Sequence, residues 1–220
     1  MAEPNRSEQQ LPDVLPLFPL SGVILLPRGQ LPLNVFEPRY LALVDDALSS
    51  ERMIGIVQPQ TESPQNSRPP LFNIGGLGRL TAFAETDDGR YLITLSGLTR
   101  FRIVRELSAL TPYRQAQVAY DRFADDRNSQ SDGPNLDRAA FLRALKRYFV
   151  ANRVDSDWES IEKAPAEALV NSLSMIAPVQ PAEKQALLEA PSVAERASIL
   201  IALIELALAS QPVHGESKPN

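Results

Sequence analysis

The stretch from Leu31 to Tyr40 constrains the fold more than any other, because its hydrophobic period changes within ten residues. Its first part has the apolar alternation of a strand, at Leu31, Leu33 and Val35. Pro38 then suits the first position of a helix, where its missing backbone N–H costs nothing. From there apolar side chains recur at the spacing of one helical face, at Tyr40, Val44, Ala47 and Leu48. The sequence therefore predicts a strand that runs directly into a helix.

The rest of the first half is predicted to consist of short extended segments. Many of the 19 prolines lie between Pro4 and Pro70, which disfavours long helices there, and Pro59–Pro70 is predicted to be a surface loop. Asp88-Gly89 favours a tight hairpin turn. Runs of strand length are Val14–Leu20, Val23–Leu26, Met53–Val57, Leu80–Glu85, Arg90–Leu95 and Tyr113–Tyr120. About six short strands with one helix predict a small, partly closed barrel.

Beyond a polar segment, Asp121–Asn135, the hydrophobic period becomes helical throughout. Two predicted helical faces consist of Leu142, Leu145 and Phe149, and of Leu169, Leu173 and Ile176. The segment Ser192–Ala209 is apolar nearly all round, so we expect it at the centre of a helical bundle.

These features predict an α+β protein with two domains. A barrel-like β domain with one helix is expected over residues 11–122, and a C-terminal α-helical bundle over residues 135–210. Residues 123–134 are predicted to link them. The polar ends, residues 1–10 and 211–220, are predicted to be disordered.

Motifs along the chain resemble the substrate-binding N-terminal domain of Lon proteases. They are Leu15–Leu20, Leu31–Leu33, Phe36–Tyr40, Gly76–Arg79, Asp88–Arg90, Gly97–Ile103 and Lys184–Glu189. The resemblance spans roughly Leu11 to Ala209 and implies a PUA-like barrel followed by helices, with a role in substrate recognition. Nothing in the sequence resembles the ATPase and protease domains of full-length Lon proteases, so a stand-alone, non-enzymatic module is expected.

The motifs of most catalytic and cofactor sites are missing. No lysine follows a glycine as a nucleotide phosphate loop requires. The chain has no cysteine and one histidine, His214, so a thiolate metal site and a Ser-His-Asp triad lack their residues. Gly76-Leu77-Gly78 begins like a dinucleotide fingerprint, but Thr81 replaces the third glycine. We therefore expect no catalytic residue, cofactor or metal; a hydrolase with an unrecognised site remains the alternative.

Charge and hydropathy limit the expected partners and the expected cellular location. A net charge of -5 disfavours nucleic-acid binding, although Arg100, Arg102, Arg105 and Arg114 leave an RNA-binding barrel face as an alternative to pairing with nearby acids. The first ten residues lack the apolar stretch of a secretory signal. Ile199–Ile204, the longest apolar run, is far shorter than the roughly 20 residues of a membrane helix. A cytoplasmic protein that does not bind membranes is expected.

The expected partners are unfolded or apolar polypeptide segments, with a separate protease as a possible second partner, in protein quality control. The resemblance implies that the corner between the strand and the helix lines a groove for such segments. The candidate binding residues are Leu25, Leu26, Leu31, Phe36, Glu37, Arg39 and Tyr40. For Glu37 and Arg39, a structural role in holding the corner is the alternative.

Overall fold

The computed structural model describes residues 11–61, 68–128 and 136–210. The chain divides into two compact units, Met1–Asn128 and Ser129–Asn220. The first is a mixed sheet with helices and the second is helical, which confirms the predicted α+β class. The ends predicted to be disordered lie outside the described residues, as do residues 62–67 of the predicted surface loop.

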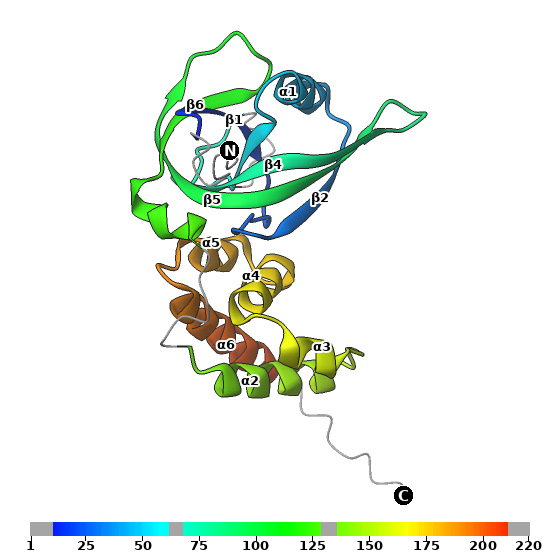
Figure 1. Ribbon diagram of the computed structural model, residues 1–220, viewed down its shortest axis with the longest axis vertical. Coiled ribbons are helices and arrows are strands. Elements are labelled where there is room, and N and C mark those ends of the chain that lie inside the picture. The colour runs from blue at the N-terminus through cyan, green and yellow to red at the C-terminus, as the bar shows by residue number, and fades with distance from the viewer. Residues whose placement is uncertain (1–10, 62–67, 129–135, 211–220) are drawn as a thin grey trace, which may run out of the picture. The chain divides into compact units, whose positions relative to one another are not determined.

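In its described residues the first unit contains six strands, one α-helix and a 3-10 helix (Figure 1). They are β1 (Val14–Pro19), β2 (Gln30–Val35), α1 (Pro38–Leu48), β3 (Met53–Val57), β4 (Ile74–Glu85), β5 (Tyr91–Leu107), β6 (Arg114–Ala119) and η2 (Asp121–Arg127). The strand order is β2-β5-β4-β3-β1-β6, with β6 also paired to β5.

The long strand β5 makes this sheet barrel-like. Its first part pairs with β2 and its last part with β6, so that β5, β4, β3, β1 and β6 form a closed ring. β1 and β3 are parallel, whereas the other pairs are antiparallel. The sheet is not a regular barrel, because β2 extends it outside the ring.

The predicted passage from strand to helix is present. β2 ends at Val35 and α1 begins at Pro38, with its buried face formed by Tyr40, Leu43, Val44 and Ala47. The predicted hairpin between β4 and β5 is also present and projects from the sheet (Figure 1). Its turn places Gly89 at φ +76°, where the Gly89 N–H donates to the Thr86 carbonyl oxygen at 2.9 Å.

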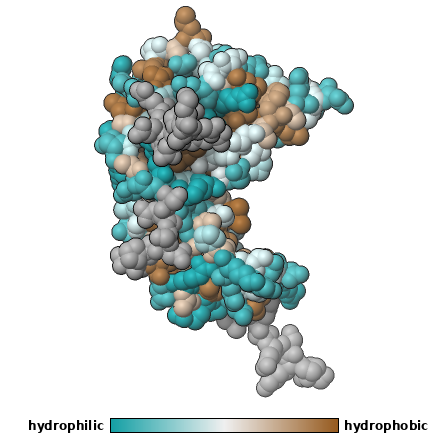
Figure 2. Space-filling model, in the orientation of Figure 1, coloured by the Kyte–Doolittle hydropathy of each residue, from teal (hydrophilic) through white to brown (hydrophobic). Residues whose placement is uncertain are grey.

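The core of the first unit lies inside the curved sheet. Phe101 on β5 is fully buried, and its ring occupies the space that side chains at Gly55 and Gly75 would fill. A Cβ at Gly75 would lie 2.5 Å from Phe101 Cζ, so glycine is required there. On the face seen in Figure 2, apolar residues are scattered among hydrophilic ones.

The polar segment after β6 differs from its prediction as a linker. Residues 121–127 form η2, which contacts β5 and belongs to the first unit. Phe123 is buried there at 3% exposure, because its ring packs against the Arg100 guanidinium 4.4 Å away. The first unit therefore continues to Asn128, and the rest of the predicted linker, residues 129–134, lies outside the described residues.

The second unit contains α2 (Arg138–Ala151), α3 (Trp158–Lys163), α4 (Ala166–Ile176), α5 (Pro181–Glu189) and α6 (Val193–Ala209). α6 packs against α2, α4 and α5, as its apolar sequence predicts. It is not enclosed on all sides, however, because Leu206 is 60% exposed. Ser192 caps α6 by accepting from the Glu195 N–H at 3.2 Å.

No helix in the described part of the chain is long and apolar enough to cross a membrane.

Candidate functional site

Leu25 and Leu26 cannot form the predicted binding surface, because they are 1% and 0% exposed. Their backbone lies against glycines of β4 and β5. A Cβ at Gly76 would lie 1.9 Å from the Leu25 carbonyl oxygen, and one at Gly97 would lie 2.0 Å from that of Leu26. The glycines thus let this segment pack directly on the sheet, which turns two apolar binding candidates into core residues.

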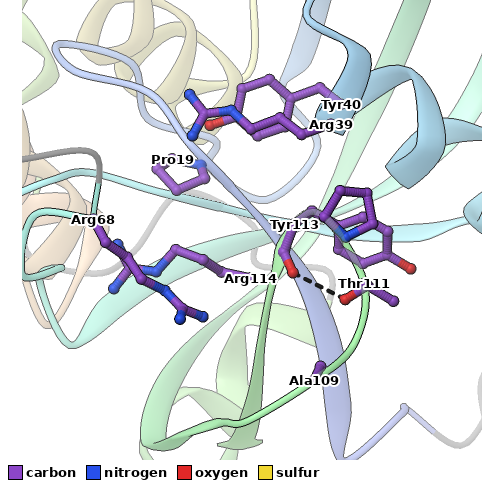
Figure 3. A pocket seen from close by; sticks show the side chains of 9 residues that line it. Pro19, Arg39, Tyr40, Arg68, Ala109, Thr111, Tyr113 and Arg114 are labelled. Carbon is purple, nitrogen blue, oxygen red and sulfur yellow. Dashed lines mark hydrogen bonds between the residues drawn. The ribbon is translucent and has the colours of Figure 1, made fainter.

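The other candidates lie at the corner between β2 and α1. Leu31 is partly buried on β2, and Phe36 is 62% exposed. Glu37 and Arg39 form an ion pair of 2.7 Å. The Arg39 guanidinium lies 4.5 Å from the centre of the Tyr40 ring (Figure 3). The Tyr40 ring itself stacks on Phe18, with 4.1 Å between the ring centres.

This stack leaves little of Tyr40 for a partner to contact. The residue is 5% exposed, and burial raises the pKa of its hydroxyl. Of the predicted residues, Phe36 is therefore the one that presents a large apolar surface. The ion pair and the stacked rings hold the start of α1 in place at this corner, and Phe36 is exposed beside them.

The second unit contains an apolar groove of about 320 Å³ between α2, α4 and α6. We call it the helical groove. Its lining side chains are uncharged, and they are Leu145, Tyr148, Phe149, Val154, Leu173, Ile176, Ala177, Pro178, Val179, Leu200, Leu203, Ile204 and Ala207.

The helical groove is open to solvent on its α4 side. Ile176, the last residue of α4, is 74% exposed, and Val154 is 45% exposed. Its size lies at the lower end of the range of about 300–1,000 Å³ for small-ligand sites. Its wall consists of apolar side chains and one tyrosine, Tyr148, so it can bind apolar groups.

From the sequence, some of these residues were expected on apolar helical faces and others in the central segment Ser192–Ala209. Leu145, Phe149, Leu173 and Ile176 were correctly placed on apolar helical faces, but periodicity does not show where one helix stops covering its neighbour. The sequence feature that could have indicated an open groove is the α6 segment. Its side chains are apolar nearly all round, so any part that the other helices leave uncovered presents an apolar surface.

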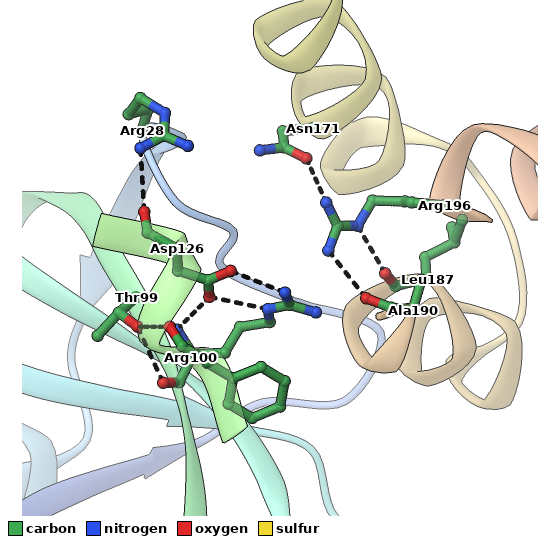
Figure 4. Close-up of polar contacts among 9 residues, drawn as sticks. Arg28, Thr99, Arg100, Asp126, Asn171, Leu187, Ala190 and Arg196 are labelled. Carbon is green, nitrogen blue, oxygen red and sulfur yellow. Dashed lines mark hydrogen bonds and ion pairs between the residues drawn. The ribbon is translucent and has the colours of Figure 1, made fainter. Parts of the chain in front are cut away.

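The arginines of the barrel face have protein partners. Arg100 pairs with Asp126 at 2.7 Å (Figure 4), Arg114 with Glu106 at 2.5 Å, and Arg102 with Asp121 at 3.9 Å. Arg105 donates to the Gln117 side chain at 3.0 Å. Three of these four arginines pair with acids, which weakens the hypothesis of an RNA-binding barrel face formed by all four.

Two aspartates of the first unit, Asp46 and Asp88, also have structural partners. Asp46 accepts from the Tyr113 hydroxyl at 2.6 Å, and burial together with this bond raises the pKa of Tyr113 to about 12. A hydrogen bond from the Thr86 hydroxyl lowers the pKa of Asp88 in the hairpin turn. In the described residues, no group of three or more His, Cys, Asp or Glu side chains could hold a metal ion.

The family model and the related sequences point to the same protein family. The family model described as "ATP-dependent protease La (LON) substrate-binding domain" matches residues 14–205. Lon protease 2 of Myxococcus xanthus is 32% identical over 133 residues, which are 60% of this chain and 16% of that protein. Lon protease of Cytophaga hutchinsonii is 26% identical over 206 residues, which are 92% of this chain and 25% of that protein.

Solved structures share the fold. A Lon N-terminal domain protein from Xanthomonas campestris aligns with a TM-score of 0.58 at 24% identity, covering 90% of this chain and 99% of that chain. The N-terminal domain of Lon protease from the Mycobacterium avium complex aligns with a TM-score of 0.61 at 19% identity, covering 87% and 98%.

Proposed function

Because the chain belongs to the family of LON substrate-binding domains, we propose that it binds apolar segments of unfolded polypeptides without catalysing a reaction itself. The helical groove is the observation that carries this proposal. The role is one of protein quality control, in which the bound segment is passed to an ATP-dependent protease. An ATP-dependent protease is part of this proposal; the chain spans 16% and 25% of the lengths of the two Lon proteases compared above.

The chemistry of the groove favours unfolded over folded clients. Folded proteins rarely display large apolar patches, so an uncharged apolar groove selects chains whose core residues are exposed. Burying one leucine or phenylalanine side chain contributes about 1.5–3 kcal/mol. Ordering the client offsets part of this gain, so we expect an affinity of roughly 1 μM or weaker for a short segment.

The single tryptophan provides a local reporter of binding. Trp158 lies 5.6 Å from Phe149, ring centre to ring centre, and Phe149 lines the groove. A tryptophan-free apolar peptide that enters the groove should therefore change Trp158 fluorescence. Titrating such a peptide, and separately a permanently unfolded model protein and its folded form, tests the proposed selectivity.

Ile176→Asp places a charge at the exposed rim of the groove with little risk to the core. We expect it to weaken peptide binding about tenfold, because the charge must be desolvated or kept apart from the client. Leu110→Asp is the matched control, since Leu110 is a fully exposed leucine of the first unit and does not line the helical groove. Equal binding by the parent, Ile176→Asp and Leu110→Asp proteins would contradict the groove assignment.

Phe36→Asp and Leu31→Asp test the site predicted from the sequence. A loss of binding confined to these variants would move the client site to the corner between β2 and α1. Leu26→Asp is unsuitable for this purpose, because Leu26 is buried and its replacement would disturb the fold.

A further inference from the structure

A second pocket, of about 250 Å³, lies in the first unit. It forms where the end of β1, the start of α1, and the segments before β4 and β6 meet. Among the described residues that line it, the charged ones are all arginines, namely Arg39, Arg68 and Arg114 (Figure 3). We call it the arginine pocket. The collection of three guanidinium groups around one hollow is notable in a chain whose net charge is -5.

Arg114 is held rigidly at this pocket. Its side chain is 12% exposed, and its Nε and Nη2 atoms donate to the two carboxylate oxygens of Glu106 at 2.9 and 2.5 Å. Nη1 donates to the Pro69 carbonyl oxygen at 2.6 Å. Because a guanidinium has five N–H groups, this arrangement leaves donors on Nη1 and Nη2 after its protein partners are satisfied.

Arg39 is fixed by different contacts and retains more donors. Its Nε and Nη2 atoms contact one oxygen of Glu37, at 2.9 and 2.7 Å. The Tyr40 ring, stacked on Phe18, supports the guanidinium from one side. Nη1 of Arg39 donates no hydrogen bond to the described residues. The Tyr40 hydroxyl likewise donates none to them.

We propose that the arginine pocket binds an oxyanion, either a phosphate group or the terminal carboxylate of a polypeptide. Planar guanidinium donors match the oxygens of both groups. None of the described residues that line the pocket is acidic, and Glu37 and Glu106, which pair with Arg39 and Arg114, lie outside its lining. Pro19, Ala109 and Pro112 also line the pocket and can contact the atoms that carry the oxyanion. This site is separate from the helical groove and does not depend on its function.

Two-dimensional NMR of the full chain tests this proposal with inorganic phosphate, pyrophosphate and a matched pair of short peptides that end in a carboxylate or an amide. Binding should shift the signals of Arg39, Tyr40, Thr111 and Arg114. Arg39→Gln should weaken binding about tenfold, the effect of losing one charge-assisted hydrogen bond. Arg90→Gln is the control, because it removes the same charge from an exposed arginine of the hairpin, outside the pocket lining.

The ligands distinguish the source of the oxyanion. Binding by the carboxylate peptide but not by its amide supports a polypeptide terminus, and binding by phosphate or pyrophosphate alone supports a phosphate ligand. Equal weakening by Arg39→Gln and Arg90→Gln would show a general charge effect and overturn the site. Absence of binding by all four probes would overturn it as well.

Discussion

The Asp126 carboxylate receives three hydrogen bonds from Arg100, at 2.9 Å from the backbone N–H, 2.9 Å from Nε and 2.7 Å from Nη2 (Figure 4). The two side chains are 4% and 9% exposed. The Asp126 carbonyl oxygen also accepts from Arg28 at 3.0 Å. These bonds tie η2 to β5 and explain why an acidic, polar segment folds as part of the first unit.

Asp126→Ala is expected to destabilise the first unit by about 3–5 kcal/mol, because it leaves a buried guanidinium without its counter-charge. Hydrogen exchange of the β5 amides, together with urea unfolding followed by circular dichroism, measures the change. Asp121→Ala is the control: its contact with Arg102 is 3.9 Å and exposed, so about 1 kcal/mol or less is expected. Similar losses in the two variants would contradict the role given to Asp126.

Gly97→Ala is expected to destabilise the first unit by about 3 kcal/mol, because the new methyl group would lie 2.0 Å from the Leu26 carbonyl oxygen. Gly89→Ala should cost only about 1 kcal/mol, since Gly89 has a positive φ but open space around it. Urea unfolding of both variants gives the comparison. A Gly97→Ala protein as stable as Gly89→Ala would show that Leu26 does not pack closely on β5.

Lys184 should titrate at an unusually low pH. It is 3% exposed, and its ammonium donates to the Ser174 carbonyl oxygen at 2.9 Å and to that of Met175 at the end of α4. Burial lowers its pKa to about 8. Lys184 should therefore show a Cε carbon shift with a midpoint near pH 8, and the Lys184→Met variant should lack this transition.

The same pKa sets the direction of a stability change. Between the folded pKa of about 8 and the normal value of 10.5, the unfolded state binds more protons, so stability rises with pH. Relative to Lys184→Met, the parent should gain about 2 kcal/mol between pH 7 and pH 10, since one pKa unit corresponds to about 1.4 kcal/mol. A constant difference across this range would contradict the lowered pKa.

The sequence alone determined the features that depend on neighbouring residues. The helix start at Pro38, the hairpin turn at Gly89 and the Ser192 cap each follow from backbone preferences within a few residues. The buried strand β3 followed from a continuous apolar run. The family motifs extended these local predictions to the whole α+β fold.

Only the tertiary structure decided which apolar residues are accessible. Leu26 and Ile176 are equally apolar in the sequence, yet Leu26 is fully buried and Ile176 is 74% exposed. The difference arises from distant partners: Gly97 admits the Leu26 backbone to the sheet, whereas α4 ends at Ile176 beyond the cover of its neighbouring helices. Exposure is a property of what packs around a residue, so hydrophobic period identifies an apolar face but not whether another element covers it.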